Sequence, residues 1–298
     1  MDNLAHIFFT GVEPVSHAWT SARPDVGLDR QPTARERATG PDDGSLDPLL
    51  AWMLERAGLR PSAYRPAAMQ RRVSACLRQL RVASANSARE LLERKPELLS
   101  FALNAVLIGV SEFFRDRAVF DYLEESALPE LLRTREGLRV CSAGVSGGQE
   151  LYSVAMLLAE AGVLGQSELL GVDCRADAIR RAGEGLFNAD DMAGVEPSRL
   201  ERFFRPAGAR WSVLPELTQR MHWRVQDLFA FDAGGACDLI LFRNVAIYFN
   251  EKHGVDVWTR LCGQLVPGGV LVTGKAEKPP ASLPLTRLAP SIYLKSRS

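Results

Sequence analysis

The sequence has no apolar run that approaches the roughly 20 consecutive residues needed to span a bilayer. Its first residues carry no basic stretch ahead of a long apolar core, so we expect neither membrane insertion nor a secretory signal. The cysteines are few and widely spaced, and no two form a Cys-x-x-Cys pair, which argues against a disulfide framework or a metal cluster. We expect a cytoplasmic protein with five reduced cysteines, Cys76, Cys141, Cys174, Cys237 and Cys262.

An excess of charge of either sign is also absent, since 36 basic and 36 acidic residues give a formal net charge of +0. This balance gives no support to a general nucleic-acid binder, and any charged partner site must be local. The four histidines show no ligand spacing, so we expect no metal. The GxxxxGKS/T phosphate loop is missing, which argues against ATP or GTP hydrolysis. We also expect the chain to be a monomer.

Three stretches of different composition follow one another along the chain. Residues 1–45 are rich in Pro, Gly, Asp and Arg with little apolar periodicity, which predicts a disordered tail. Residues 46–110 have helical apolar spacing and predict a small helical domain. From about residue 135, strand candidates alternate with helices, which predicts an α/β fold with a doubly wound, mainly parallel sheet.

The first strand candidate ends in a glycine-rich turn, Gly144 to Gly148, and the second ends in Asp173. Ligands of doubly wound sheets bind at the carboxyl ends of the strands, where glycine lets the backbone approach closely. The turn lacks the GxGxxG register, which weakens a dinucleotide interpretation. A cationic nucleoside such as S-adenosylmethionine suits Asp173 at its ribose and Glu150 at its ammonium group. An ordinary tight turn, with Glu150 complementing a helix N-terminus, is the alternative.

Several motifs in order along the chain strengthen the cofactor interpretation. Read together, they resemble the motifs of the CheR family of chemotaxis receptor methyltransferases, from about residue 48 to the C-terminus. The resemblance begins in the helical stretch that contains Tyr64-Arg65. The further matching segments are SEFFRD at 111–116, GVSGGQELYS at 144–153, Asp173, DLF at 227–229, FRNVAIYFN at 242–250, PGG at 267–269 and GKAE at 274–277.

The resemblance implies a Rossmann-like class I methyltransferase domain over residues 111–298 that uses S-adenosylmethionine, with a small antiparallel lobe inserted within residues 200–224. It implies that residues 46–110 form an N-terminal helical substrate-recognition domain. Carried over position by position, it makes Arg115 and Tyr248 the catalytic residues that face the reacting centre. The implied cofactor-binding residues are Ser111, Arg115, Glu150, Asp173, Asp227, Leu228, Arg243 and Asn244.

Five positions depart from the family pattern, although both carboxylates expected at the cofactor, Glu150 and Asp173, are kept. Each departure exchanges one polar or small residue for another at a motif position. Gln149 replaces the first Glu of a Gly-Glu-Glu run, Arg175 the second Asp of Asp-Ile-Asp, Ser111 a Thr, Asp227 an Asn, and Gly109 an Asn that is frequent in the family.

A basic stretch precedes these motifs, with six arginines and no acid between residues 60 and 81. Arg65 and Arg72, like Arg71 and Arg78, are seven apart, so each pair shares a face of a continuous helix. Such a face would steer an acidic substrate helix. The resemblance indicates the methylated helical bundle of a chemoreceptor-like protein as that partner. A solvated basic face is the alternative, and a nucleic-acid site has little aromatic support here.

Methyl transfer to a glutamate side chain suits these residues. A glutamate carboxyl has a pKa of about 4.3 and is ionised near neutrality, so no general base is needed and the missing Ser-His-Asp constellation is no obstacle. We predict a protein-glutamate O-methyltransferase that forms methyl esters on a chemoreceptor-like protein in chemotaxis-type signalling. A methyltransferase with another acceptor, or a non-catalytic protein that binds S-adenosylmethionine or S-adenosylhomocysteine, are the alternatives.

Overall fold

The computed structural model describes residues 45–297 except residues 108 and 110. The tail predicted over residues 1–45 therefore lies outside the described residues, apart from Ser45. None of the helices in the described part of the chain has the length and apolarity to cross a membrane. Nor do His, Cys, Asp and Glu side chains gather there in a group of three or more that could hold a metal ion.

Short helices make up the first described segment, as the apolar spacing predicts. The first begins where the Asp47 carboxylate accepts hydrogen bonds from the N–H groups of Leu49 and Leu50, at 2.9 and 3.4 Å, ahead of Pro48 at the first helical position. These helices are α1 (Pro48–Arg56), α2 (Pro66–Met69), α3 (Val73–Leu80), α4 (Ala85–Arg94) and α5 (Leu99–Val106).

The basic stretch is not one continuous helix. Arg65 precedes α2, and a 3-10 turn at Gln70–Arg72 separates α2 from α3. The expectation that arginines seven apart share one helix face is therefore wrong, because that rule needs an unbroken α-helical repeat. Arg65, Arg71 and Arg78 are nevertheless exposed, and Arg72 is half-buried.

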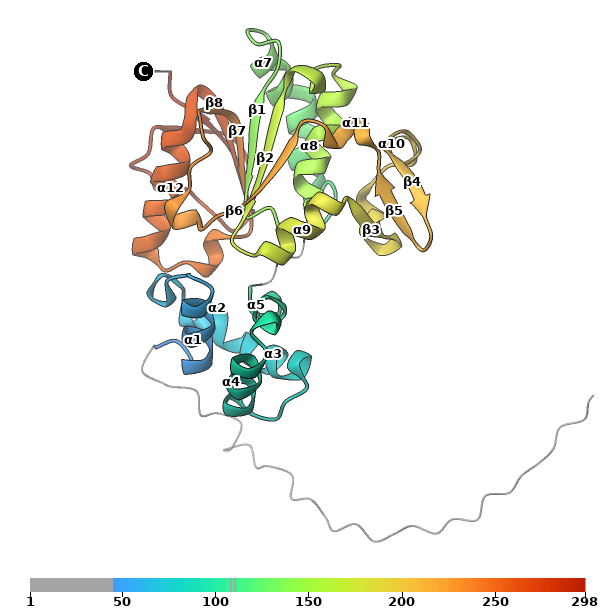
Figure 1. Cartoon of the computed structure of the whole chain (residues 1–298). Helices are drawn as coiled ribbons and strands as arrows, with labels where there is room; N and C mark the ends of the chain where they lie inside the picture. Colours follow the sequence, from blue (N-terminus) through green and yellow to red (C-terminus); the bar gives the residue numbers. More distant parts are fainter. Residues whose placement is uncertain (1–44, 108, 110, 298) are drawn as a thin grey trace, which may run out of the picture. The chain divides into compact units, whose positions relative to one another are not determined.

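A seven-stranded sheet occupies the centre of the rest of the chain, with strand order β6-β2-β1-β7-β8-β10-β9 (Figure 1). The first five strands in this order are parallel, and β10 and β9 close one edge as an antiparallel pair. The predicted doubly wound α/β fold is confirmed. The strands are β1 (Arg139–Ala143), β2 (Glu168–Asp173), β6 (Met221–Val225), β7 (Cys237–Phe242), β8 (Leu265–Thr273), β9 (Leu285–Ala289) and β10 (Ile292–Lys295).

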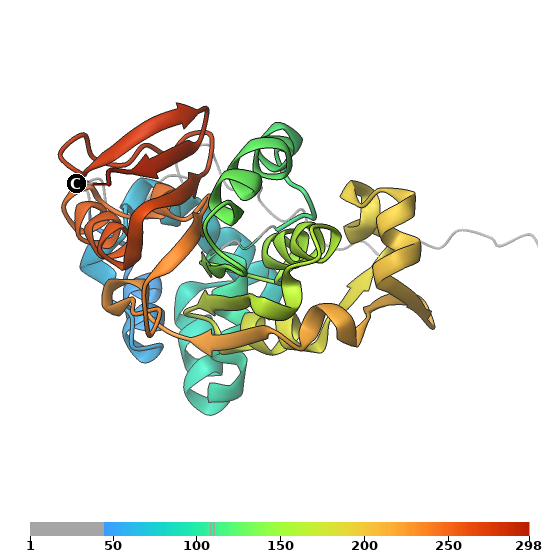
Figure 2. The ribbon, with the colours of Figure 1, turned by 90° about the horizontal axis from the view of Figure 1, so that it is seen from above.

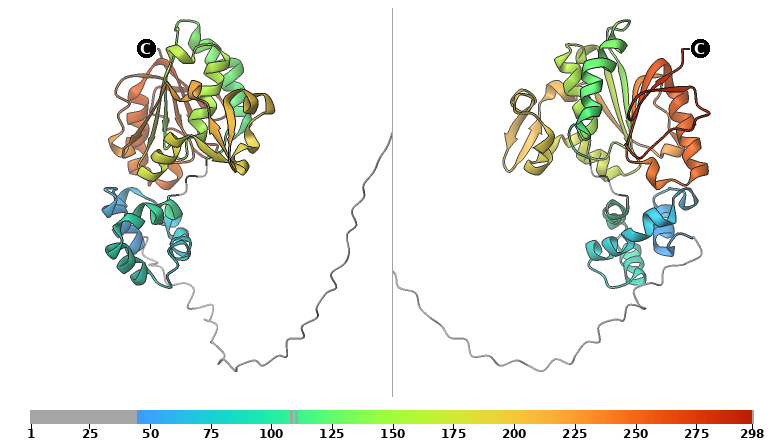
Figure 3. Two further views of the ribbon diagram at one scale, coloured as in Figure 1. Left: turned by 45° about the vertical axis from the view of Figure 1, so that its right-hand side comes forward. Right: turned by 180° about the vertical axis from the view of Figure 1, so that it is seen from behind.

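Helices cover both faces of this sheet, so its central strands are apolar on both sides. Figure 3 shows α8 (Gln149–Glu160) and α12 (Glu251–Gln264) on opposite faces. Successive residues of β7 alternate between them: Leu241 joins the core under α8, and Phe242 packs edge-on against Trp258 of α12, with ring centroids 4.7 Å apart. The remaining helices are α6 (Arg117–Tyr122), α7 (Leu128–Leu132), α9 (Ala176–Glu184), α10 (Pro197–Phe203) and α11 (Pro215–Thr218).

The predicted inserted lobe is present as a small antiparallel sheet of order β3-β5-β4, which lies to one side of the large sheet in Figure 2. Its strands are β3 (Leu186–Asn188), β4 (Phe204–Ala207) and β5 (Arg210–Val213). The predicted limits, 200–224, are wrong at both ends. The three residues of β3 are too few to show a strand pattern, and β6 instead pairs along its length with β2 of the large sheet.

Candidate functional site

A cavity of about 360 Å³ opens where four neighbouring strands end. Its wall includes the turn after β1, Asp173 at the end of β2, Asp227 shortly after β6, and Arg243 and Asn244 directly after β7. Parallel strands bring their carboxyl ends to one edge of a sheet, which is where such folds bind ligands. The volume lies in the range of small-molecule sites, roughly 300–1,000 Å³.

The turn after β1 needs glycine at its first position. Gly144 has φ +83°, and a side chain there would clash with the methyl group of Val245. The N–H groups of Gly144 and Val145 both donate to the carbonyl oxygen of Val172 in β2, at 2.7 and 2.9 Å. The turn is thus tied to the neighbouring strand and leaves its outer side to the cavity.

Asp173 is buried and serves as a hydrogen-bond acceptor for two segments. It accepts from the backbone N–H of Ser146 at 2.9 Å and of Arg175 at 3.0 Å. The Arg175 guanidinium also grips both of its oxygens, from Nε to Oδ1 at 3.0 Å and from Nη2 to Oδ2 at 3.1 Å. Burial alone would lower the pKa of Arg175. The charge of Asp173 and its hydrogen bonds with Arg175 outweigh that effect, so the net shift is upward. This contact was not expected from the sequence.

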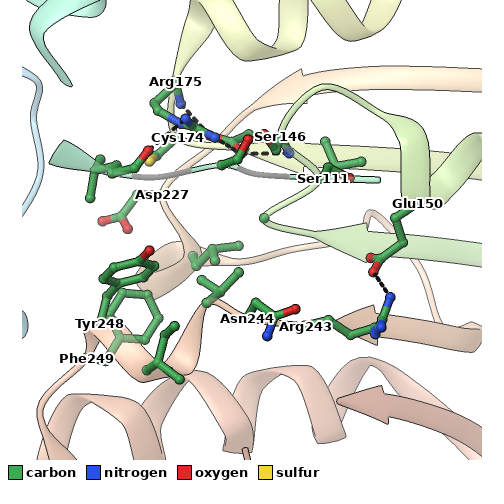
Figure 4. A pocket seen from close by; sticks show the side chains of 18 of the residues that line it. Ser111, Ser146, Glu150, Cys174, Arg175, Asp227, Arg243, Asn244, Tyr248 and Phe249 are labelled. Atoms are coloured by element: carbon green, nitrogen blue, oxygen red, sulfur yellow. Dashed lines mark hydrogen bonds and ion pairs between the residues drawn. The ribbon is translucent and has the colours of Figure 1, made fainter. Parts of the chain in front are cut away.

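Glu150, at the start of α8, is joined to Arg243 on one side of the cavity (Figure 4). Its carboxylate accepts from Ser142 Oγ at 2.8 Å and from Arg243 Nη1 at 2.9 Å. Nη2 of Arg243 donates to Asp116 Oδ2 and to the Arg115 carbonyl oxygen, both at 2.8 Å. Burial would raise the pKa of Asp116, but the hydrogen bond from Lys275 and the charge of Arg243 bring it below the usual value of 3.8.

The loop after β7 is held by a residue that we did not predict as part of the site. The buried Glu277 carboxylate accepts hydrogen bonds from the N–H groups of Asn244, Val245, Ile247 and Gly274, at 2.7 to 3.3 Å. Burial raises the pKa of Glu277, and these four donors lower it only in part. The only signal in the sequence was its place in the segment GKAE.

Tyr248 lines the other side of the cavity, beside Phe249 and opposite Glu150 and Arg243 (Figure 4). Burial raises the pKa of its phenol, although the positive charges of Arg72, Arg175 and Arg115 lower it in part. The net shift is upward, so the phenol is neutral around pH 7 and can donate a hydrogen bond.

The helical segment contributes a buried tyrosine, Tyr64, to the cavity wall. Its neighbourhood is joined to the loop after β7 by a bridge between Tyr64 and Phe249 and by a 2.8 Å hydrogen bond from the Arg65 N–H to the Tyr248 carbonyl oxygen. Tyr64 also meets the Phe249 ring edge-on, with ring centroids 5.6 Å apart. The motif that contained Tyr64 was noted in the sequence, but nothing in it indicated a side chain in the cavity.

All residues predicted to bind cofactor or to catalyse line this one cavity, although they come from five separate segments of the chain. They are Ser111, Arg115, Glu150, Asp173, Asp227, Leu228, Arg243, Asn244 and Tyr248. The four arginines predicted to bind substrate, Arg65, Arg71, Arg72 and Arg78, do not line it. Lining residues that the prediction missed include Tyr64, Glu112, Ser146, Cys174, Ile247 and Phe249.

Comparison with known proteins finds one family. Residues 109–286 match the family described as "CheR methyltransferase, SAM binding domain". The chain is 29% identical over 242 residues to the chemotaxis protein methyltransferase of Listeria monocytogenes, across 80% of this chain and 92% of that protein. It is 32% identical over 195 residues to chemotaxis protein methyltransferase 1 of Pseudomonas aeruginosa, across 60% and 70% of the two chains.

A solved structure is also similar at a low level. It is the N-methyltransferase NodS from Bradyrhizobium japonicum WM9 in complex with S-adenosyl-L-homocysteine, with 18% identity and a TM-score of 0.33. The match covers 58% of this chain and 71% of that chain.

The cavity suits S-adenosylmethionine by the chemistry of its walls. The carboxylates of Glu150, Asp173 and Asp227 complement a ligand with a positive sulfonium and ammonium, and Leu228 and Phe249 offer apolar surface to an adenine ring. Asp173 was expected to accept hydrogen bonds from the ribose hydroxyls. In the structure its carboxylate is already paired with the Arg175 guanidinium.

Proposed function

The chain belongs to the CheR methyltransferase family, and on that basis we propose that it methylates glutamate side chains of a chemoreceptor-like protein. Its cofactor is S-adenosylmethionine, which supplies a methyl group on a positively charged sulfur. Transfer of that group to a side-chain carboxylate would break the sulfur–methyl bond, form a methyl ester and release the neutral thioether S-adenosylhomocysteine.

The cavity walls supply what this cofactor requires. Glu150 lies near the N-terminus of α8 with its carboxylate held by Ser142 and Arg243, and we assign to it the cofactor's ammonium group. Asp227 accepts a hydrogen bond from the Phe229 N–H at 3.1 Å and lines the cavity with the rest of its carboxylate, as Figure 4 shows. Leu228 and Asn244 complete the cofactor set that we propose.

The acceptor side of the reaction needs alignment rather than proton removal. A glutamate carboxylate is already ionised at pH 7, so the residues around it have to orient it and remove its water. We assign this orientation to Arg115, through its positive charge, and to Tyr248, whose raised pKa keeps its hydroxyl protonated. Neither residue has to act as a base.

One observation carries the proposal: two potential donors for an acceptor carboxylate, Arg115 and Tyr248, line the same cavity as Glu150 and Asp227. A cationic donor and an anionic acceptor can then meet in one enclosed space. The exposed arginines of the helical segment, Arg65, Arg71 and Arg78, support a protein acceptor, because their positive charge would attract an acidic substrate helix.

The first test is direct. Purified protein is incubated with methyl-labelled S-adenosylmethionine and membranes that carry a chemoreceptor, and the labelled products are separated by size. We expect label on the receptor that is released by mild base, as methyl esters are. Label that survives base, or label on small molecules only, would contradict a glutamate acceptor, and cofactor binding without transfer to any receptor would favour a non-catalytic role.

The second test addresses the class of acceptor by charge reversal. We expect Arg71→Glu/Arg72→Glu to reduce receptor methylation by about 100-fold, since two reversed charges would repel an acidic substrate helix. Binding of S-adenosylhomocysteine should change less than about threefold. Arg94→Glu/Lys95→Glu is the matched control, an exposed basic pair in the same helical segment that should leave methylation unchanged. Equal losses in both double variants would refute a role for this stretch in recognition.

A further inference from the structure

The acceptor capacity of Asp173 is fully used inside the protein. A carboxylate offers about four lone-pair sites. In this chain two are taken by the N–H groups of Ser146 and Arg175, and two by the Nε and Nη2 atoms of the Arg175 side chain, all within 3.1 Å. The pair is buried, with side-chain exposures of 6% for Arg175 and 5% for Asp173.

A ribose diol would therefore have to compete for this carboxylate. Its two hydroxyl groups bind by donating hydrogen bonds, and on Asp173 the only side-chain donors that could make way are those of Arg175. The two N–H donors belong to the backbone of the turn after β1 and of Arg175, the residue before α9, so a shift of the Arg175 side chain leaves them in place. The competition is thus between two ribose hydroxyls and one guanidinium fork.

The guanidinium has a second anchor on the helical segment. Its Nη1 donates to the Leu107 carbonyl oxygen at 2.8 Å and to Asn104 Oδ1 at 3.3 Å. These bonds use Nη1, whereas Asp173 receives its bonds from Nε and Nη2, so the contact with Asp173 is only part of what holds the side chain.

Gly109 makes the room in which the guanidinium lies. A Cβ at residue 109 would clash with both Nη2 of Arg175 and Oγ of Ser146, and Ser146 Oγ donates to the Gly109 carbonyl oxygen at 2.8 Å. Two positions that depart from the family pattern, Gly109 and Arg175, are therefore in contact. Each departure has a structural reason in the other: a larger residue at 109 would exclude this placement of Arg175.

We propose that Arg175 sets the cofactor affinity of this chain by competing with the ribose hydroxyls for Asp173. The inference rests on the proposed function, because it takes S-adenosylmethionine as the ligand of the cavity. Its consequence is that the side chain that most stabilises Asp173 in the free protein weakens the binding of cofactor.

The experiment measures affinity and stability together. Titration calorimetry with S-adenosylhomocysteine, and thermal melting without ligand, are applied to the wild type and to Arg175→Ala. We expect binding to tighten by about 10-fold, as expected for removing a competing charge-assisted hydrogen bond, while the melting temperature falls because a buried carboxylate loses its partner. If Arg175 has a purely structural role, Arg175→Ala should lower both the affinity for S-adenosylhomocysteine and the melting temperature.

A ligand change isolates the ribose. The 2′-deoxy analogue of S-adenosylhomocysteine lacks one of the competing hydroxyls. We expect the wild type to bind the two ligands within about threefold of each other, and Arg175→Ala to prefer the diol by about 10-fold. An equal preference in both proteins would overturn the competition.

Two further variants keep the test decisive. Arg180→Ala, on the helix that follows Arg175 but paired with Asp177 and Glu184 at the surface, is the control for loss of one positive charge and should bind like the wild type. If Arg175→Ala does not fold, Arg175→Lys retains the charge without the two-pronged grip and should still bind about threefold more tightly. Unchanged or weaker binding in the Arg175 variants overturns the inference, whereas no binding by any protein, wild type included, overturns the proposed function.

Discussion

Two single residues, Glu277 and Asp173, are buried carboxylates that each receive four hydrogen bonds, but the donors of those bonds differ. Glu277 receives all four from backbone N–H groups, one of Gly274 and three of the loop that leads to Tyr248. Asp173 receives two from backbone and two from the side chain of Arg175. The first arrangement fixes a loop, and the second can be exchanged for a ligand.

Replacing Glu277 with Gln should show how much the loop depends on this carboxylate. One of its two oxygens becomes an NH₂ group that cannot accept, so two buried N–H groups lose their acceptor. We expect a loss of about 2–4 kcal/mol in the free energy of unfolding, measured by urea denaturation. Methyl transfer should fall more in kcat than in KM for cofactor, because Tyr248 is displaced rather than removed. Glu97→Gln, at an exposed position, is the control, and equal stability of the two variants would contradict the role of Glu277.

Among the elements, Arg243, directly after β7, connects two others, α8 and the segment before α6. It binds Glu150 of α8, the Arg115 carbonyl oxygen, and Asp116, which immediately precedes α6. Lys275, after β8, pairs with Asp116 at 2.6 Å. These charges hold the segment with Arg115 against the sheet, so the position of Arg115 in the cavity depends on the ionisation of Asp116.

The pH dependence of stability follows from the lowered pKa of Asp116. Its stabilising contribution is complete above the usual value of 3.8 and is lost as the pH falls through the lower value in the folded protein. Asp116→Asn should therefore unfold more easily than the wild type by about 1–2 kcal/mol at pH 7, and the difference should shrink below about pH 4. Urea unfolding at pH 7, 5 and 3.5 measures it, with the exposed Asp190→Asn as control. A difference that stays constant with pH would refute this assignment.

Across the whole molecule, charge is balanced in sum but not in position. The formal net charge is +0, while the stretch from residue 60 to 81 carries six arginines and no acid. Long-range attraction of an acidic partner must then come from this local surface rather than from the molecule's total charge.

Ionic strength should separate the two binding steps. Raising salt from about 50 to 300 mM shortens the screening length to below about 10 Å. We expect the KM for receptor to rise several-fold, while the Kd for S-adenosylhomocysteine, which binds among buried groups, changes less than twofold. Steady-state rates and calorimetry over the salt series test this. A salt-independent KM for receptor would argue that the arginines are a solvated face without a partner.

Much of the fold was predictable because its signals are local. The alternation of apolar strands and helices after residue 135 predicted the sheet, and short motifs predicted nine residues that line one cavity. Two local predictions were wrong. Residues 65–78 have helical spacing, but the helix is broken at Gln70–Arg72, and β3 is too short to be visible in the sequence.

The chemistry expected of the cavity follows from residue types in a fixed order, and these could be read along the chain without knowledge of the fold. The sequence could not show which carboxylate lone pairs in the cavity are free, because hydrogen-bond partners are set by contacts between distant segments. The Arg175 guanidinium that binds Asp173 also donates to Leu107 and lies against Gly109, and both residues are more than 60 positions earlier in the chain. The sequence gives only the order of the residues. Which donor binds the Asp173 carboxylate is decided by distances and burial in the folded chain.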